Sequence, residues 1–237
     1  MNLMKMIPPK TKKAVKQRVN ELKTQDLSNK ITDKILYDLL HDSYTDPLQK
    51  GLGRYAKTLV HESLEDNVDD FLKGKNYNFI KELKSLDRDD EFYDDKVEEL
   101  NNRFHNVYAD VETDIIGSSA LQVKTWNDSI KLADTHYMQF LCVADDKTDE
   151  ECLECDGTTL PMDDPWWDEH TPLLHYNCRC TTIMVDKDEA EETENPPDVD
   201  TEDGLANNPA KTGKIFDESH TNLDIPDPIK KRIDEQL

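Results

Sequence analysis

The feature that most constrains this chain is a cluster of cysteines and one histidine between residues 152 and 180. The cluster reads Cys-Leu-Glu-Cys at its start and His-Tyr-Asn-Cys-Arg-Cys at its end, and it holds four of the chain's five cysteines. Two close ligand pairs separated by a loop are typical of a small zinc site, where each pair supplies half of a tetrahedral set. The candidate metal ligands are Cys152, Cys155, His175, Cys178 and Cys180.

The spacing leaves two ligand sets open. The first cysteine pair can present both sulfurs from one tight turn, which the following Asp-Gly favours. On an extended strand, Cys178 and Cys180 share one side, which gives a four-cysteine site with His175 as a neighbour. If the segment curves, His175 and Cys178 form the second pair and Cys180 lies behind them. A closed set of either kind predicts a structural zinc ion, because no position is left for a reactive water.

Composition places the chain at the polar edge of globular proteins. It has 35% hydrophobic and 34% charged residues and a net charge of −23. No apolar run is long enough to span a membrane, and the N-terminus lacks the apolar core of a signal peptide. We therefore expect synthesis in a reducing cytoplasm, which favours metal binding over disulfides. So acidic a chain is expected to touch DNA only through its basic first 24 residues, because phosphate neutralisation dominates such binding.

Apolar periodicity predicts a helical region over residues 1–130, arranged as a bundle or long hairpin. A short basic amphipathic helix comes first, and the longest pattern, from Phe92 to Ile130, predicts one long helix. The expected boundaries between them are a cap at Ser28 or Asn29, a start at Pro47, a stop at Gly74 and a break near Gly117.

The period changes after residue 130. Residues 136–143 and 180–185 read as strands on either side of the cysteine loop, so 131–186 are expected to form a small β-unit. Residues 187–207 are rich in acids and proline and predict a disordered or extended linker. Residues 208–237 predict a docking tail, with a short helix begun by Pro228. The fold class is therefore α+β, with a helical N-terminal part, a β-unit stapled by Cys and His, and an extended acidic C-terminal tail.

Catalysis finds little support in the sequence. His170 or His175 could activate a metal-bound water with Asn177 as its partner, as in a ββα-metal nuclease, but a ligand or packed histidine is the simpler interpretation. The chain has no glycine loop that would cradle a phosphate, and nothing marks one cysteine as an activated nucleophile. We expect no catalytic residues, no cofactor other than zinc, and no enzyme activity.

The central motif resembles that of the Mu F-like minor head proteins of tailed bacteriophages, also called the phage head morphogenesis family. The family's signature is similar to the Cys-x2-Cys-Asp-Gly of residues 152–157 and the Pro-x2-His-x2-Cys-Arg-Cys of residues 172–180. A segment further along, Asn208 to His220, is also similar to one found in that family. Glu112 matches an acidic residue there.

The resemblance implies a structural minor capsid protein of the virion, made in the host cytoplasm and bound at or near the portal vertex. Its expected partners are the portal protein and other head proteins, and its expected roles are head assembly and the packaging or ejection of DNA. The alternative is a nuclease or toxin-type effector that carries a Mu F-like domain with a histidine-based metal site. Nothing after Val185 predicts a second catalytic module, which favours the structural role.

Overall fold

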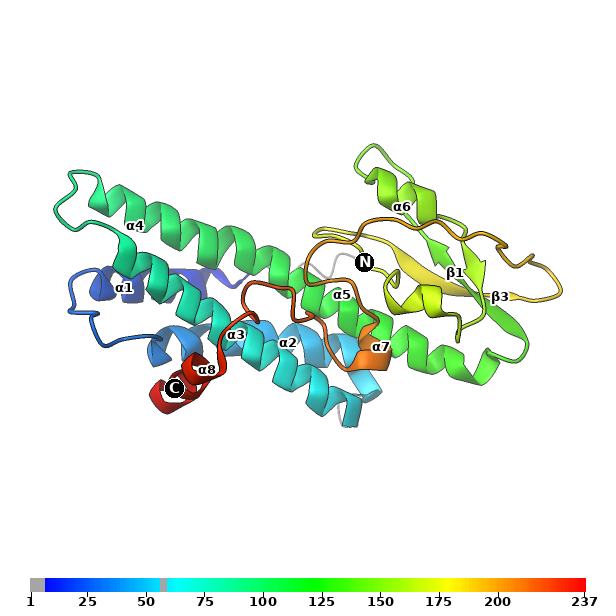
Figure 1. The fold of residues 1–237 in the computed structure, drawn as a ribbon, viewed down its shortest axis with the longest axis horizontal. Helices are drawn as coiled ribbons and strands as arrows, with labels where there is room; N and C mark the ends of the chain where they lie inside the picture. Colours follow the sequence, from blue (N-terminus) through cyan, green and yellow to red (C-terminus); the bar gives the residue numbers. More distant parts are fainter. Residues whose placement is uncertain (1–6, 56–58) are drawn as a thin grey trace.

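Helices fill the first half of the chain, and a small sheet follows them in a computed structural model that describes residues 7–55 and 59–237 (Figure 1). The helical part comprises α1 (Pro9–Leu22), α2 (Lys34–Leu52), η1 (Gly53–Tyr55), α3 (Leu59–Ser85), α4 (Tyr93–Asn102), η2 (Arg103–Val107), α5 (Tyr108–Ser129) and η3 (Ile130–Leu132). The remainder comprises β1 (His136–Leu141), α6 (Glu150–Cys155), β2 (Thr159–Leu160), η4 (Pro165–Asp168), β3 (Thr181–Asp186), α7 (Pro209–Thr212) and α8 (Asp227–Gln236). The predicted α+β class is confirmed.

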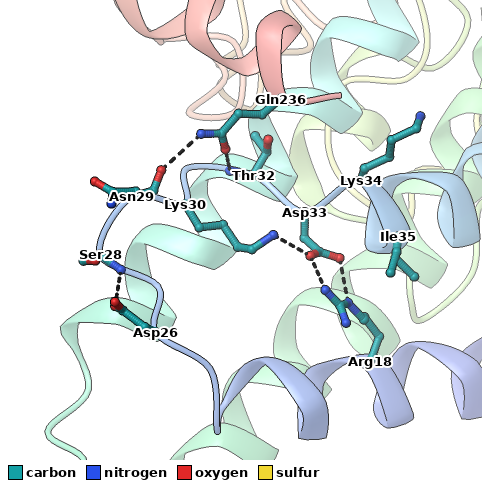
Figure 2. Close-up of a pocket in the computed structure, with 10 residues that line it drawn as sticks. All are labelled: Arg18, Asp26, Ser28, Asn29, Lys30, Thr32, Asp33, Lys34, Ile35 and Gln236. Carbon is teal, nitrogen blue, oxygen red and sulfur yellow. Dashed lines mark hydrogen bonds and ion pairs between the residues drawn. The ribbon is translucent and has the colours of Figure 1, made fainter.

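The second helix begins at a different residue from the one that the sequence predicted. Asp33, not Ser28 or Asn29, caps α2, because its carboxylate accepts a hydrogen bond from the Leu36 backbone N–H at 2.9 Å. Arg18 and Lys30 pair with the same buried carboxylate, each at 2.8–2.9 Å (Figure 2). Burial by itself would raise the pKa of Asp33, but the hydrogen bonds from these two cations lower it to about 2.

Pro47 does not begin a helix, because α2 runs through it without a break. A proline inside a helix costs roughly 3 kcal/mol. The helix carries an uninterrupted buried stripe at every fourth position, and each buried leucine contributes about 1.5–3 kcal/mol. That stripe is Leu36, Leu40, Tyr44, Leu48 and Leu52. Its burial outweighs the cost of the proline.

Gly74 does not end a helix either, since α3 continues to Ser85. A Cβ added at Gly74 would lie 1.7 Å from the backbone oxygen of Asn222, so the glycine marks the place where the C-terminal tail crosses α3. The break expected near Gly117 is also absent, because that residue lies inside α5. The long helix is irregular at η2 instead, where one π-helical turn joins α4 to α5.

Acids of the long helix pair with some of the lysines in and directly after the basic first helix. α1 buries Val15, Val19 and Leu22 as its amphipathic pattern predicts. Ion pairs reach from this segment across to α4 and α5: Lys12 with Asp110, Lys16 with Glu98, and Lys23, the residue after α1, with Asp94. The expected DNA-contacting segment also includes Lys5, which lies outside the described residues.

Three antiparallel strands form the sheet in the order β2-β1-β3. Both predicted strands are confirmed as β1 and β3, and the two-residue β2 was not foreseen because it is too short to show a period. Met138 of β1 stands opposite Leu160 on one side and Met184 on the other. The sheet joins the helices where the Gln122 side chain of α5 donates to the Cys180 carbonyl at 3.2 Å.

The acidic linker is extended, one of the two forms expected, and it lies along the β-unit. The backbone N–H of Thr193 donates to the Thr159 carbonyl at 2.8 Å, and that of Glu202 donates to the Leu174 carbonyl at 2.8 Å. The Trp166 indole donates to the Pro197 carbonyl at 2.6 Å. These bonds pass the chain from the sheet back toward the helices (Figure 1).

The tail packs on the helical body. Phe216 stacks on Phe71 of α3 with ring centroids 4.0 Å apart, and both side chains are fully buried. The Asn67 side chain accepts from the backbone N–H groups of Ile215 and Phe216 and donates to the Phe216 carbonyl. The last helix, α8, begins with Pro228 in its first turn. None of the helices in the described part of the chain is long and apolar enough to cross a membrane.

Candidate metal centre

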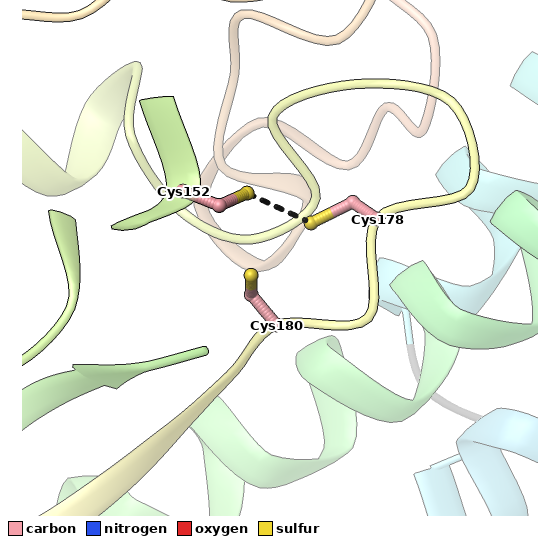
Figure 3. A group of neighbouring side chains, drawn as sticks. All are labelled: Cys152, Cys178 and Cys180. Atoms are coloured by element: carbon pink, nitrogen blue, oxygen red, sulfur yellow. Dashed lines mark hydrogen bonds between the residues drawn. The ribbon is translucent and has the colours of Figure 1, made fainter. Parts of the chain in front are cut away.

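Three cysteine sulfurs converge between α6, the loop that follows residue 175 and the start of β3. The ligand atoms of Cys152, Cys178 and Cys180 all lie within 4.8 Å of one another, and all three residues are buried (Figure 3). The sulfurs of Cys152 and Cys178 are 3.6 Å apart. Cys152 is held on a short helix rather than in the tight turn expected from the sequence.

His175 lies beside this sulfur group, although its ring nitrogens are not within 4.8 Å of all three sulfurs. Its Nε2 lies 3.1 Å from the Cys152 sulfur. Its Nδ1 lies 2.9 Å from the carbonyl oxygen of Tyr176 and 3.0 Å from a carboxylate oxygen of Asp149. A proton on Nδ1 satisfies these acceptors, and Nε2 is the nitrogen that faces the sulfurs. A carboxylate or carbonyl behind the histidine is the usual support of a metal-ligating imidazole.

The electrostatics of the group favour a thiolate. Hydrogen bonds from Cys152 and Cys180 lower the pKa of the Cys178 thiol far below its usual range. Hydrogen bonds to the sulfurs of Cys152 and Cys178 raise the pKa of His175 to about 11. Metals are ligated by thiolate and by neutral imidazole, so a cation bound here would take the place of the proton that His175 carries beside the sulfurs.

The fifth candidate, Cys155, stands outside the group. It is buried, but it is absent from the set of ligand atoms that lie within 4.8 Å of one another. Burial raises the pKa of its thiol to about 12, as expected of a cysteine that packs as a small apolar side chain. The geometry matches neither ligand set left open by the sequence: it groups Cys152, Cys178 and Cys180, and His175 touches this group through the Cys152 sulfur.

This donor set fits a tetrahedral ion. A zinc–sulfur bond of about 2.3 Å places two sulfurs of a tetrahedral site roughly 3.8 Å apart. The observed 3.6 Å between Cys152 and Cys178 agrees with that spacing. Three thiols and one imidazole in a buried pocket are a common structural ligand set, so the cluster can hold a metal ion.

The other histidine considered for catalysis is built into the packing. The His170 ring stacks on Trp166 with centroids 4.8 Å apart and planes 8° apart. Its two nitrogens lie 3.1 Å from the Trp166 carbonyl and 3.3 Å from the Val199 carbonyl. Asn177, its proposed partner, is exposed with a positive φ of 64°. Neither ring nitrogen of His170 is directed at open solvent.

Sequence reasoning missed the polar groups that support the centre and join it to the body. Asp149 gave no signal, because acids are abundant around it. The Tyr176 hydroxyl lies 2.8 Å from Nε2 of His220, which links the loop of the metal centre to the docked tail. The only sequence feature that could have pointed to Tyr176 is its position directly after the candidate ligand His175.

The region that contains this centre matches the model of one protein family. The model for "Phage Mu protein F like protein" matches residues 64–183, half of the chain. The matched region begins in α3 and ends in β3, and it contains all five candidate ligands. No curated protein and no solved structure matches the chain.

Proposed function

Because this chain belongs to the phage Mu protein F-like family, we propose that it is a minor capsid protein of a tailed phage, bound at or near the portal vertex. Membership supports a role in phage head morphogenesis and association with other head proteins. The portal position and a part in DNA packaging or ejection are the finer content of the proposal. The match across residues 64–183 is the observation that carries it.

The metal centre has a structural part in this proposal. We assign zinc to Cys152, Cys178, Cys180 and His175, with Cys155 as a packing residue. The ion would join α6, the loop after His175 and the start of β3. A closed set of four protein ligands leaves no open position, so the zinc would stabilise the fold rather than activate water.

The proposed role is not enzymatic. The ring nitrogens of His170 and His175 face backbone carbonyls, sulfurs or a carboxylate of the protein, which supports a packing or ligand role for both. The test is incubation of the purified protein with duplex DNA and Mg²⁺, Mn²⁺ or Zn²⁺. We expect no cleavage above that of a Cys152→Ser, Cys178→Ser variant, and metal-dependent cleavage by the wild type alone would favour the nuclease alternative.

DNA contact is proposed for α1 in particular. The lysines of α1 that pair with α4 and α5 are engaged, whereas Lys10 and Lys13 are exposed. A contact limited to two cations on a chain of net charge −23 would be weak and sensitive to salt. Such a weak contact fits a protein that DNA passes during packaging or ejection better than a protein that binds DNA stably.

The experiment that tests the proposal uses the phage that encodes the chain. An early stop codon is placed in the gene and the intact gene is supplied from a plasmid. Mass spectrometry of purified virions should find the protein in few copies, and chemical cross-linking should join it to the portal protein. Without the plasmid, the yield of filled heads should fall. Normal virions that lack the protein would contradict the proposal.

A further inference from the structure

A small basic hollow lies where α3, α8 and the loop before α2 meet. Its volume is about 210 Å³, and the charged side chains that line it are Lys30, Lys81, Lys84 and Arg232. No acidic residue lines it, although the chain has 52 acids and 29 bases. Among the residues that the structure describes, Lys81, Lys84 and Arg232 form no ion pair. We call this site the basic hollow.

The rest of the basic hollow is apolar. Its remaining lining residues are Ile31, Tyr77, Ile80 and Ile229. The Lys81 ammonium lies 5.9 Å from the centre of the Tyr77 ring, so it is held at the edge of this apolar surface. A group that binds here must fill the apolar floor and also neutralise the basic side chains around it. A protein surface does this when it presents one aliphatic side chain flanked by carboxylates. A bare phosphate backbone would leave the apolar floor uncovered.

The same chain presents such a group on α6. Leu153 is 46% exposed there, and Glu150 and Glu154 are exposed beside it. These three residues have the i, i+3 and i+4 spacing that places side chains on one helical face. Cys152 and Cys155 occupy the opposite, buried face. Neither glutamate forms an ion pair within the described part of the chain. We call this surface the acidic leucine face.

We propose that the acidic leucine face of one copy of this chain docks in the basic hollow of a second copy. Leu153 would enter the apolar floor, and Glu150 and Glu154 would pair with Lys81 and Arg232. The two surfaces lie toward opposite ends of the molecule, with α6 at the upper right of Figure 1 and α8 at the lower left. The contact is therefore head-to-tail, and repeating it builds a ring or an open chain of copies.

The local attraction prevails over the repulsion between two chains of net charge −23. At physiological ionic strength the Debye length is about 8 Å, so charges far from the contact are largely screened. Charges that meet at the contact are screened much less, and they select the partner and its orientation. The distribution of charge over the surface therefore decides the association, and the total charge does not.

A charge-reversal experiment tests this contact. One variant carries Lys81→Glu and Arg232→Glu, and the other carries Glu150→Lys and Glu154→Lys. Sedimentation velocity over a concentration series should show that the wild type associates and that each variant alone does so at least about tenfold more weakly. An equimolar mixture of the two variants should recover association, because each reversed surface then meets its complement.

The controls separate this contact from loss of folding and from other occupants. Lys10→Glu with Lys131→Glu changes the net charge as much as the first variant does, and it should associate like the wild type. Metal content and thermal stability show that each variant is folded. A wild type that stays monomeric overturns the proposal, including the case in which the basic hollow binds duplex DNA. Folded variants that associate unchanged, or a mixture that shows no recovery, also overturn it.

Discussion

Lys75 and Glu112 form an ion pair inside the helical body, where their side chains are 1% and 7% exposed. The ammonium lies 2.7 and 2.8 Å from the two carboxylate oxygens, and the Tyr44 hydroxyl also donates to Glu112. Burial lowers the pKa of Lys75 even with this partner. The pair joins α3 to α5, and removal of one member would leave the other charged and buried, at a cost of about 3–5 kcal/mol.

His105 lies beside this pair and makes stability depend on pH. Burial, together with the Lys75 charge, lowers its pKa to about 3, whereas the unfolded chain binds the proton near pH 6.5. Between these values the unfolded state holds one more proton, so stability falls by about 1.4 kcal/mol for each pH unit of acidification. His105→Gln should remove that contribution and keep a polar group near Asn101. Urea unfolding between pH 7 and pH 5 measures both slopes, and equal slopes would contradict the assignment.

Two cysteines of α6 offer a matched test of the metal ligand set. Cys152 lies in the sulfur group and Cys155 outside it, although both are buried on one short helix. Cys152→Ser should lose the zinc ion, and thermal unfolding should then no longer respond to a chelator. Cys155→Ser should keep about one zinc per chain and lose about 1–3 kcal/mol, because its buried hydroxyl lacks a partner. Elemental analysis of both proteins decides, and zinc loss in the Cys155 variant alone would reverse the assignment.

At the scale of elements, close approaches between segments fix how α2, α3 and α5 lie. A Cβ at Gly51 of α2 would come within 2.6 Å of the Ala120 side chain of α5. The two helices therefore touch backbone to backbone at this point. The tail approaches α3 in the same way, because its backbone at Asn222 lies against Gly74. These contacts need glycines within helices, where intrinsic preference opposes them.

Gly74→Ala separates helix propensity from tail docking. Propensity alone predicts a gain of about 1 kcal/mol, because alanine is the better helix former. The added methyl would meet the Asn222 backbone, so we expect a loss of about 1–3 kcal/mol instead. Gly117→Ala in α5 is the control, since its Cβ would lie 3.4 Å from Pro47, an ordinary contact. It should be neutral or stabilising. Denaturant unfolding gives both signs, and a stabilised Gly74 variant would mean that the tail is not seated there.

At the scale of the whole molecule, one hydrophobic core connects the helices, the β-unit and the tail. It contains Leu48 of α2, Phe140 of β1 and Phe216 of the tail within a single contiguous cluster. Trp126 of α5 meets Trp167 of the cysteine loop with ring centroids 6.1 Å apart. The parts identified from composition are therefore joined by packing as well as by chain connectivity.

This continuous core predicts cooperative unfolding of the zinc-loaded protein. Far-UV circular dichroism reports mainly the helices, and tryptophan fluorescence reports the contact between Trp126 and Trp167. The two signals should follow one thermal transition with the same midpoint. A chelator should lower both midpoints together. A fluorescence transition well below the helical one would show that the β-unit unfolds independently.

The sequence by itself determined the elements whose signal is local. The stripe of α1, the strands β1 and β3 and the cysteine–histidine spacing depend on neighbours along the chain, and each was predicted. The family also followed from a local motif. The boundaries at Pro47, Gly74 and Gly117 were wrong because each residue was interpreted by its intrinsic preference.

Only the tertiary structure decided what those residues contact. Pro47 is tolerated because burial continues on both sides of it, and Gly74 serves a segment nearly 150 residues further along the chain. The grouping of three cysteines, the contact of His175 with Cys152 and the placement of Cys155 outside the group depend on how α6 is oriented against a distant strand. Spacing along a chain limits which ligands can meet, whereas packing between remote segments selects those that do.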